Sequence, residues 1–194
     1  MLDIMSRAAP VIQAQGLSKQ FDDVMAVRDL SFSVEAGQVL GLLGPNGAGK
    51  TTTINMMTTL TPIGSGVASV DGYDVATQPA VVRQRIGLAG QAAAVDEKLT
   101  ARENLELFAR LYKLPKERRA ERIDELIERF DLGAFADRIA GTYSGGERRR
   151  LDVVAALVVD PPALFLDEPT TGLDPRSRVE LWGAIRSLAV EGTA

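Results

Sequence analysis

The chain has 194 residues, 45% of them hydrophobic and 25% charged, which suits one globular domain with a full core and an inserted lobe. Its formal net charge of -4 argues against a general nucleic-acid binder. Because the sequence contains neither cysteine nor histidine, disulfides, thiolate metal sites, a cysteine nucleophile and a histidine general base are all excluded.

The sequence predicts a cytoplasmic chain with no membrane span of its own. Residues 1–10 lack an apolar segment long enough for a signal peptide and are expected to be flexible. The longest apolar stretches, such as residues 153–159, are far too short to span a bilayer. Any membrane role would therefore act through a separate partner.

The first part of the chain is predicted to form a small antiparallel sheet. Short apolar runs indicate strands at residues 11–15, 24–27 and 30–34, the first of them at an edge. Turns are expected at residues 22–23 and 28–29. Phe21 has polar neighbours, and this local pattern alone favours a half-buried side chain in the sheet.

The most informative stretch is an apolar run that leads into glycines. Residues 39–43 read as a buried parallel strand, and residues 44–51 match the phosphate-loop pattern G-x-x-x-x-G-K-[ST]. Glycines let successive backbone N–H groups face a phosphate, and the helix that begins near Gly49 directs its unsatisfied N–H groups at the same anion. Lys50 would reach the β- and γ-phosphates, and the Thr51 hydroxyl would bind Mg²⁺.

Strands and short helices continue after this phosphate loop (residues 44–51). A helix at residues 51–60 is followed by strands at 67–70 and 86–89, with one or two helical turns at 79–85 between them. The alternation of helix and strand is typical of an α/β protein.

A charged helical block at roughly residues 100–140 interrupts that pattern and is the candidate inserted lobe. Thr100 and Glu103 form a capping box for its first helix, in which Leu111 is expected to extend the apolar stripe of Leu105 and Phe108. The apolar positions of its second helix are Ile123, Leu126, Ile127 and Phe130. The charged run at residues 116–122 is expected to be a solvated helix face.

Ser144-Gly145-Gly146-Glu147 forms a second capping box and starts a further helix. Arg148, Arg149 and Arg150 would be exposed in the first turn of that helix, where positive charge opposes the helix dipole. Three basic residues in this place indicate that a neighbouring group calls for positive charge.

Two carboxylates follow the apolar run at residues 163–166. Placing the carboxylates of Asp167 and Glu168 at the end of a buried strand costs free energy unless a cation or polar partner lies there. In a protein with a phosphate loop, Asp167 would hold Mg²⁺ and Glu168 would orient or deprotonate an attacking water. Asp174 and Pro175 then start the final helix, as N-cap and first helical residue.

These motifs together resemble the ATPase subunit of an ATP-binding cassette (ABC) transporter, essentially from Val11 onward. The family's motifs occur in order, as the first nucleotide motif at residues 44–52, the Q-loop at Gln91, the signature at residues 144–147, the second nucleotide motif at residues 163–168 and the D-loop at residues 173–174. The alanines after Gln91, the segment T-A-R-E-N-L and the run R-R-R-L-D are most similar to daunorubicin-resistance-type exporters.

The resemblance implies an α/β fold of the P-loop NTPase class, with a parallel core sheet, an antiparallel β-subdomain and an inserted helical subdomain. The expected division is residues 11–99 for the phosphate-loop core with its antiparallel part, 100–160 for the helical subdomain, and 161–194 for the second nucleotide motif and D-loop. It also implies ATP and Mg²⁺ as cofactors, a head-to-tail dimer with a second ATPase subunit, and an integral membrane permease as partner. The chain would then lie peripherally on the cytoplasmic face of the cell membrane.

The resemblance further assigns roles to individual residues. It implies nucleotide contacts by Phe21, Gly44, Pro45, Asn46, Gly47, Ala48, Gly49, Lys50, Thr51, Thr52, Gln91, Ser144, Gly145, Gly146, Glu147 and Asp174. Metal ligation is implied for Thr51, Gln91 and Asp167, and catalysis for Glu168 and Lys50. Phe21 would stack on adenine, which replaces its interpretation as an ordinary sheet residue.

Two features depart from the family pattern. The signature reads Y-S-G-G-E rather than L-S-G-G-Q, so we expect Tyr143 to be a packing change and Glu147 to fold back onto the Ser144 amide. The family's switch histidine, or its substitute, follows the last helix on a strand that this sequence does not reach. We therefore expect a C-terminally incomplete domain whose core sheet lacks a strand.

The leading hypothesis is an ATP-hydrolysing energy subunit for export of a small molecule, with a drug or antibiotic as the expected cargo. A nucleotide-dependent interaction module with little turnover is the alternative, because the switch segment is missing. An ABC-type ATPase of DNA repair or the ribosome ranks low, since coiled coils, zinc insertions and a tandem cassette do not occur in the sequence.

Overall fold

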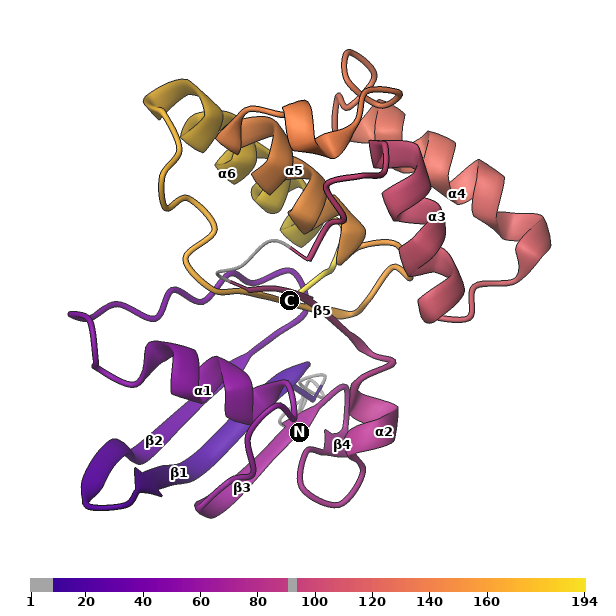
Figure 1. Ribbon diagram of the computed structural model, residues 1–194. Helices are drawn as coiled ribbons and strands as arrows, with labels where there is room; N and C mark the ends of the chain where they lie inside the picture. Colours follow the sequence, from indigo (N-terminus) through magenta and orange to yellow (C-terminus); the bar gives the residue numbers. More distant parts are fainter. Residues whose placement is uncertain (1–8, 91–93) are drawn as a thin grey trace, which may run out of the picture. The chain divides into compact units, whose positions relative to one another are not determined.

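The computed structural model describes residues 9–90 and 94–194. It divides into two compact units, Met1–Arg85 with Ala189–Ala194, and Ile86–Leu188. Each unit has its own sheet and helices (Figure 1).

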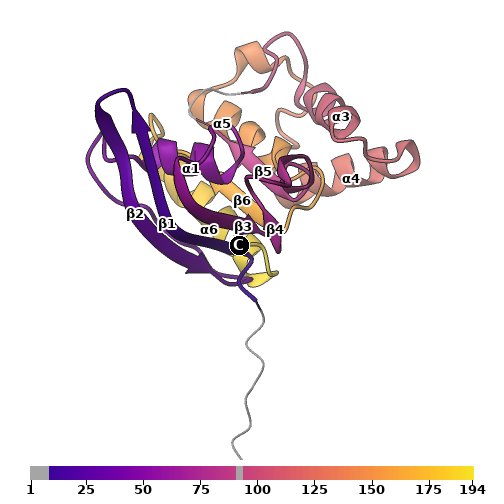
Figure 2. The ribbon, with the colours of Figure 1, turned by 90° about the horizontal axis from the view of Figure 1, so that it is seen from below.

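The first unit is built on a four-stranded antiparallel sheet in the order β2-β1-β3-β4. Its strands are β1 (Ile12–Phe21), β2 (Val24–Val34), β3 (Ser65–Val70) and β4 (Tyr73–Asp74). The long hairpin of β1 and β2 is seen in Figure 2. The predicted turn at residues 22–23 is confirmed, since Phe21 pairs with Val24 across it.

Two details of this sheet differ from the sequence prediction. The strand predicted at an edge is instead an inner strand, because β1 pairs with β2 on one side and with β3 on the other. The turn predicted at residues 28–29 is a strand irregularity within β2. Asp29 has a left-handed φ of 47°, its N–H donates to Ser18 Oγ at 2.9 Å, and the register of β1 against β2 shifts nearby, as at a β-bulge.

The prediction of a buried parallel strand at residues 39–43 is wrong. These residues have no strand conformation, and Val39, Leu40 and Leu43 are 56%, 46% and 96% exposed. A strand is stable only where a neighbour accepts its backbone hydrogen bonds, and among the described residues no strand pairs with this run. Apolar composition alone does not supply that neighbour.

Helix α1 (Lys50–Met57) follows the phosphate loop and lies on the sheet of the first unit (Figure 1). It contacts β2 and β3, and Met56 and Met57 on its buried side are almost fully enclosed. The short helix α2 (Pro79–Val82) confirms the predicted helical turn. The phosphate loop therefore lies between the irregular residues 39–43 and helix α1, within the first unit.

The second unit combines a two-stranded parallel sheet with a group of helices. β5 (Ile86–Ala89) and β6 (Ala163–Leu166) pair from Ile86 with Ala163 to Ala89 with Leu166. Its helices are α3 (Ala101–Leu111), α4 (Lys116–Arg129), η1 (Ala140–Thr142), α5 (Gly145–Ala155) and α6 (Pro175–Val190). Leu105 of α3, Leu126 of α4 and Leu151 of α5 are fully buried in one apolar core.

The predicted apolar stripe of α4 is confirmed, since its four residues are all buried. In α3 the prediction fails at Leu111, which is 65% exposed. The buried side of α3 contains Leu105 and Ala109, and Leu111 lies two residues beyond Ala109, on a different face of the helix. Periodicity placed the stripe correctly but extended it one residue too far.

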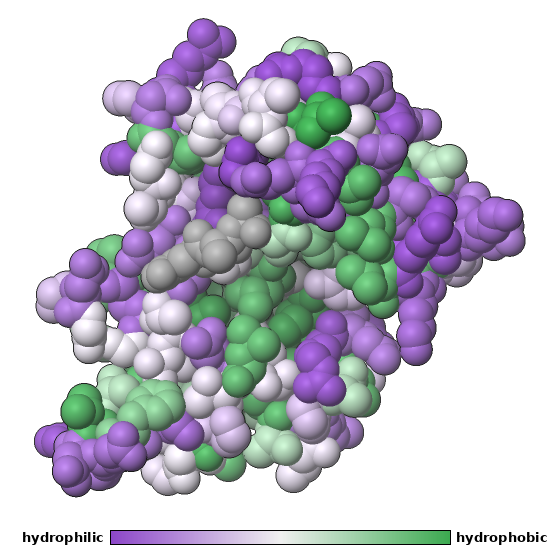
Figure 3. Space-filling view, in the orientation of Figure 1, coloured by the Kyte–Doolittle hydropathy of each residue, from purple (hydrophilic) through white to green (hydrophobic). Residues whose placement is uncertain are grey.

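The outer face of α4 is hydrophilic, as Figure 3 shows on the right of the view. The prediction of a solvated face is nevertheless wrong for Arg122, whose side chain is only 13% exposed. Its guanidinium donates to the carbonyls of Leu157 and Val158, which follow α5. This arginine satisfies carbonyl groups that the end of a helix leaves without intrahelical partners.

Candidate functional site

The phosphate loop turns on glycines that have left-handed backbone conformations. Gly47 has φ 84° and Gly49 has φ 87°, and the Ala48 N–H donates to the Pro45 carbonyl at 3.2 Å. A Cβ atom on Gly49 would lie 2.2 Å from the carbonyl oxygen of Ala26 in β2. Only glycine therefore fits at the residue that caps the N-terminus of α1.

Lys50 is the first residue of α1, and its ammonium lies over the loop. Its Nζ donates to the carbonyl oxygens of Gly44 and Pro45, at 2.9 Å each. Within its own unit, as far as the structure describes it, Lys50 makes no ion pair with a carboxylate. The positive charge is thus held at the loop by neutral acceptors, at the helix end where an anion is favoured.

The hydroxyl residues of α1 differ in exposure. Thr51 is exposed, Thr52 is half-buried and Thr53 is buried, with its hydroxyl donating to the Gly49 carbonyl at 2.9 Å. Asn46 and the rest of residues 44–48 are exposed. The face of the loop that the sequence assigns to a ligand is therefore open to solvent within this unit.

Phe21 lies at the end of the β1–β2 hairpin and is 46% exposed. The Lys19 ammonium lies 5.1 Å from the centroid of its ring. The hairpin is connected to the phosphate loop through Ala26, whose carbonyl contacts Gly49. An exposed aromatic ring and the loop are therefore carried on the same packed sheet.

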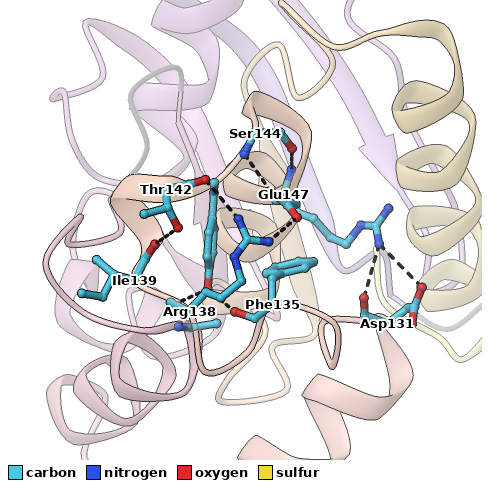
Figure 4. A network of polar contacts seen from close by, with 10 residues as sticks. Asp131, Phe135, Arg138, Ile139, Thr142, Ser144 and Glu147 are labelled. Carbon is cyan, nitrogen blue, oxygen red and sulfur yellow. Dashed lines mark hydrogen bonds and ion pairs between the residues drawn. The ribbon is translucent and has the colours of Figure 1, made fainter.

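The signature (residues 144–147) forms the capping box that the sequence predicts (Figure 4). The Glu147 N–H donates to Ser144 Oγ at 3.2 Å, and the Ser144 N–H donates to Glu147 Oε2 at 2.7 Å. Arg138 donates to the other carboxylate oxygen at 3.2 Å. The Ser144 backbone N–H is the largest cause that lowers the pKa of Glu147, and the Arg138 charge adds to it.

Tyr143 fills the position before the signature and is buried, which confirms the expected packing change. Its ring packs edge-to-face on Phe135, with centroids 4.9 Å apart. Its hydroxyl accepts from the Ala101 N–H at 3.2 Å and lies 2.7 Å from the Phe135 carbonyl, to which it can donate. The hydroxyl thereby ties the start of the signature to the start of α3.

Asp167 and Glu168 diverge at the end of β6. Asp167 is 5% exposed, and its N–H extends the β5–β6 pairing by donating to the Ala89 carbonyl at 3.0 Å. Glu168 is exposed and has a φ of 50°, which a residue with a side chain adopts only under constraint. Its Oε2 accepts from the Thr171 hydroxyl at 3.0 Å.

Asp174 caps α6, as predicted. Its Oδ1 accepts from the N–H groups of Arg176 and Ser177, and its Oδ2 accepts from the Ser177 hydroxyl at 2.6 Å. The Ser177 hydroxyl is the main cause that lowers the pKa of Asp174. A Cβ atom on Gly146 would lie 2.7 Å from Ser177 Oγ, so the second glycine of the signature closely approaches α6.

The expectation that all three arginines after the signature are exposed is wrong, because Arg149 is buried and Arg148 and Arg150 are half-buried. Each arginine pairs with a carboxylate inside the second unit. The pairs are Arg148 with Glu97, Arg149 with Asp152, and Arg150 with Glu180. These carboxylates are neighbouring groups that favour positive charge, as the sequence indicated. Sequence reasoning missed Arg149, although Asp152 at i+3 on the same helix was a usable signal.

One expected site residue lies outside what the structure describes. Gln91 falls in residues 91–93, which are not among the described residues. Among the residues that are described, no group of three or more acidic, cysteine or histidine side chains could hold a metal ion by itself. The described helices also include none that is long and apolar enough to cross a membrane.

Hard oxygen donors are nevertheless present for a magnesium ion. In the first unit Thr51 is an exposed residue with a hydroxyl group, and in the second unit Asp167 is a buried carboxylate at a strand end. Mg²⁺ in proteins is usually bound by one or two such groups together with substrate phosphates and water. Each of these groups, taken in its own unit, is the kind of oxygen donor that binds magnesium together with the phosphates of a nucleotide.

Comparison with known proteins gives closely related sequences. The daunorubicin resistance ATP-binding protein DrrA2 of Streptomyces coeruleorubidus is 52% identical over 182 residues, which are 94% of this chain and 56% of that protein. The Nod factor export ATP-binding protein I of Burkholderia pseudomallei (strain 1710b) is 44% identical over 181 residues, which are 93% of this chain and 60% of that protein. The chain thus spans somewhat more than half the length of these relatives.

A solved structure described as the ATP binding subunit of an ABC transporter is 28% identical, with a TM-score of 0.81 over 94% of this chain and 76% of that one. This likeness confirms the predicted α/β fold class with its parallel and antiparallel sheets. The predicted resemblance to daunorubicin-resistance proteins is confirmed by the sequence identities. Because residues 27–171 also match the family described as ABC transporter, the chain belongs to the ABC transporter family.

Proposed function

We propose that this chain binds and hydrolyses ATP with Mg²⁺, and that the hydrolysis powers export of a small molecule through a partner membrane permease. The observation that carries the proposal is the phosphate loop itself. Its left-handed Gly47 and Gly49 bring the loop onto the N-terminus of α1, where Lys50 supplies positive charge. Such an arrangement suits the phosphates of a nucleotide.

The nucleotide would be held from several sides. Backbone N–H groups of residues 44–52 and the Lys50 ammonium would bind the β- and γ-phosphates, and the exposed ring of Phe21 would stack on adenine. Thr51, Gln91 and Asp167 would hold Mg²⁺, which supplies neutralisation of the charge on the β- and γ-phosphate oxygens.

Glu168 is the proposed base. The residue is exposed and its carboxylate accepts a hydrogen bond from the Thr171 hydroxyl, the one side-chain bond that it makes among the described residues, so it keeps acceptor capacity for a water. A carboxylate in this role orients the water and receives its proton as the γ-phosphoryl group is attacked. Asp174 would contribute to the site at the start of α6, the helix that it caps.

A second copy of the chain would complete the site in a head-to-tail dimer. The Ser144 hydroxyl, the N–H groups of Gly145 and Gly146 and the N-terminus of α5 would contact the γ-phosphate that the other copy binds. Glu147 is turned back onto the Ser144 N–H and paired with Arg138, which limits its repulsion of that phosphate. We retain the domain division at residues 11–99, 100–160 and 161–194 as part of this proposal.

The export role and the membrane location are drawn from the relatives. One is described as a daunorubicin resistance protein and the other as a Nod factor export protein, so the cargo differs among them. We propose a position on the cytoplasmic face of the cell membrane, attached to a permease. A drug or antibiotic is the proposed cargo, since the drug-resistance relative has the higher identity.

The test compares ATP affinity and turnover for the wild-type protein, Glu168→Gln and Lys50→Ala. We expect Glu168→Gln to bind ATP as the wild type does but to hydrolyse it about 100-fold or more slowly, as for loss of a general base. Lys50→Ala should weaken binding itself. Equal, negligible turnover in wild type and Glu168→Gln, with ATP still bound, would instead favour the interaction module.

A further inference from the structure

Arg149 of α5 is buried and bonded almost entirely to backbone. Its guanidinium donates to the carbonyl oxygens of Asp167 and Pro169, at 3.0 Å each, and also to the Gly90 carbonyl. It further donates to Asp152 Oδ2 at 2.9 Å. One side chain thus reaches the segments that follow both β5 and β6.

Asp152 completes this connection. It is 3% exposed, and its second carboxylate oxygen accepts from the Ala94 N–H at 2.8 Å. The Arg149–Asp152 pair therefore bonds to Gly90 and Ala94, the described residues on either side of residues 91–93. Both of these partners are backbone atoms of residues that the structure describes.

The same pair brackets the proposed base. Asp167 and Pro169 are the residues before and after Glu168, and both of their carbonyls are bonded by one guanidinium. Between them Glu168 has its left-handed φ of 50°. Because the backbone direction at a residue sets where its side chain points, two bonds on either side constrain the Glu168 carboxylate.

The attachment of α5 to its neighbours does not require a buried charge. Val153 of α5 already packs with Ala89 of β5 and with Leu181 and Ile185 of α6 in one apolar cluster. A buried ion pair carries a desolvation cost that apolar residues of similar size would avoid. The pair is thus better explained by the backbone geometry that it maintains than by a role in holding α5 against its neighbours.

We propose that Arg149, oriented by Asp152, is a positioning residue for ATP hydrolysis, which holds the backbone around Glu168 in register with the signature helix α5. The inference rests on the proposed function above. The Arg149–Asp152 pair would connect helix α5, which Ser144 caps, with Glu168 in the same chain. The N-terminus of α5 is also where the nucleotide of a second copy would bind. Arg149 itself touches neither the nucleotide nor the water.

The test uses Arg149→Lys in the purified protein. Lysine keeps the charge, but a single ammonium cannot reproduce the fork of donors that spans these carbonyls. We expect kcat to fall about 10- to 100-fold, as for a misplaced catalytic group, while Kd for ATP stays within about twofold. Hydrogen exchange of the amides in residues 163–171 should become faster, with or without nucleotide.

Arg150→Lys is the matched control, because Arg150 is the next residue of the same helix and pairs with Glu180 near the surface. It should change kcat by less than about twofold. Asp152→Asn removes the charge that orients Arg149 at nearly constant volume and should reproduce the loss of kcat. This second variant decides the question if Arg149→Lys does not fold.

Each outcome separates this inference from the proposed function. A wild-type protein that binds ATP without turnover refutes the proposed function, and the exchange experiment still reports whether Arg149 orders residues 163–171. Normal wild-type turnover with an unchanged kcat in Arg149→Lys overturns the positioning role. A lowered melting temperature with unchanged kcat, or failure of both variants to fold, means that the pair is only structural and also overturns it.

Discussion

Replacing Gly49 by alanine should damage the phosphate loop through its backbone. Gly49 has φ 87°, and a non-glycine residue in the left-handed region costs about 1–2 kcal/mol. The added Cβ would also lie 2.2 Å from the Ala26 carbonyl oxygen and 3.0 Å from Val27 Cγ2. Forcing a group into a packed site adds about 1–3 kcal/mol, so we expect a total loss of about 2–5 kcal/mol for Gly49→Ala.

Gly47→Ala provides a matched control in the same loop. Gly47 has nearly the same φ, 84°, but a Cβ placed there would meet nothing within 4 Å. Only the backbone strain remains, so the expected loss is about 1–2 kcal/mol. The difference between the two variants therefore isolates the contact of the loop with β2.

Urea unfolding of the wild type and both variants measures these losses, with the m-value checked for constancy. The free energy of unfolding should decrease more for Gly49→Ala than for Gly47→Ala. Equal losses in the two variants would refute the packing of Gly49 against Ala26. An unchanged stability for Gly49→Ala would refute the left-handed conformation as well.

Three further predictions concern the second unit. Tyr143→Phe should lower the stability by about 1–3 kcal/mol in urea unfolding, because the Ala101 N–H loses its buried acceptor; no loss would exclude this bond. The pKa of Glu147 is lowered in the folded state, so its stabilisation is present above the unfolded pKa and is lost as the pH falls through the folded pKa. Glu147→Gln should therefore flatten the acid side of the stability–pH curve, and identical curves would contradict the capping bond. Gly146→Ala should lower the melting temperature, because the added Cβ would meet the Ser177 hydroxyl. Adding Ser177→Gly should restore part of that loss in the double variant, and additive losses would exclude the contact.

Local sequence signals predicted local structure well. The capping boxes at Thr100 and Ser144 and the cap at Asp174 all form as expected, because each joins atoms two or three residues apart. The same holds for the turn after Phe21. Such contacts depend on few dihedral angles, so the identity of nearby residues suffices to specify them.

Predictions that needed a distant partner were less reliable. Residues 39–43 have the composition of a buried strand, but a strand is specified by pairing, and none is present for them in the described chain. Leu111 continues an apolar pattern yet lies off the buried face of α3. In both cases composition indicated hydrophobicity but not which surface would cover it.

By itself the sequence determined the phosphate loop, the signature with its cap, and the carboxylates after the second apolar run, since these motifs are contiguous. Only the tertiary structure decided that Arg149 is buried, because its acceptors at Gly90, Asp167 and Pro169 lie far from it in sequence. An arginine in a charged run is ordinarily solvated. Its burial is stable here because folding brings carbonyl oxygens and Asp152 around one guanidinium and satisfies the donors that burial removes from water.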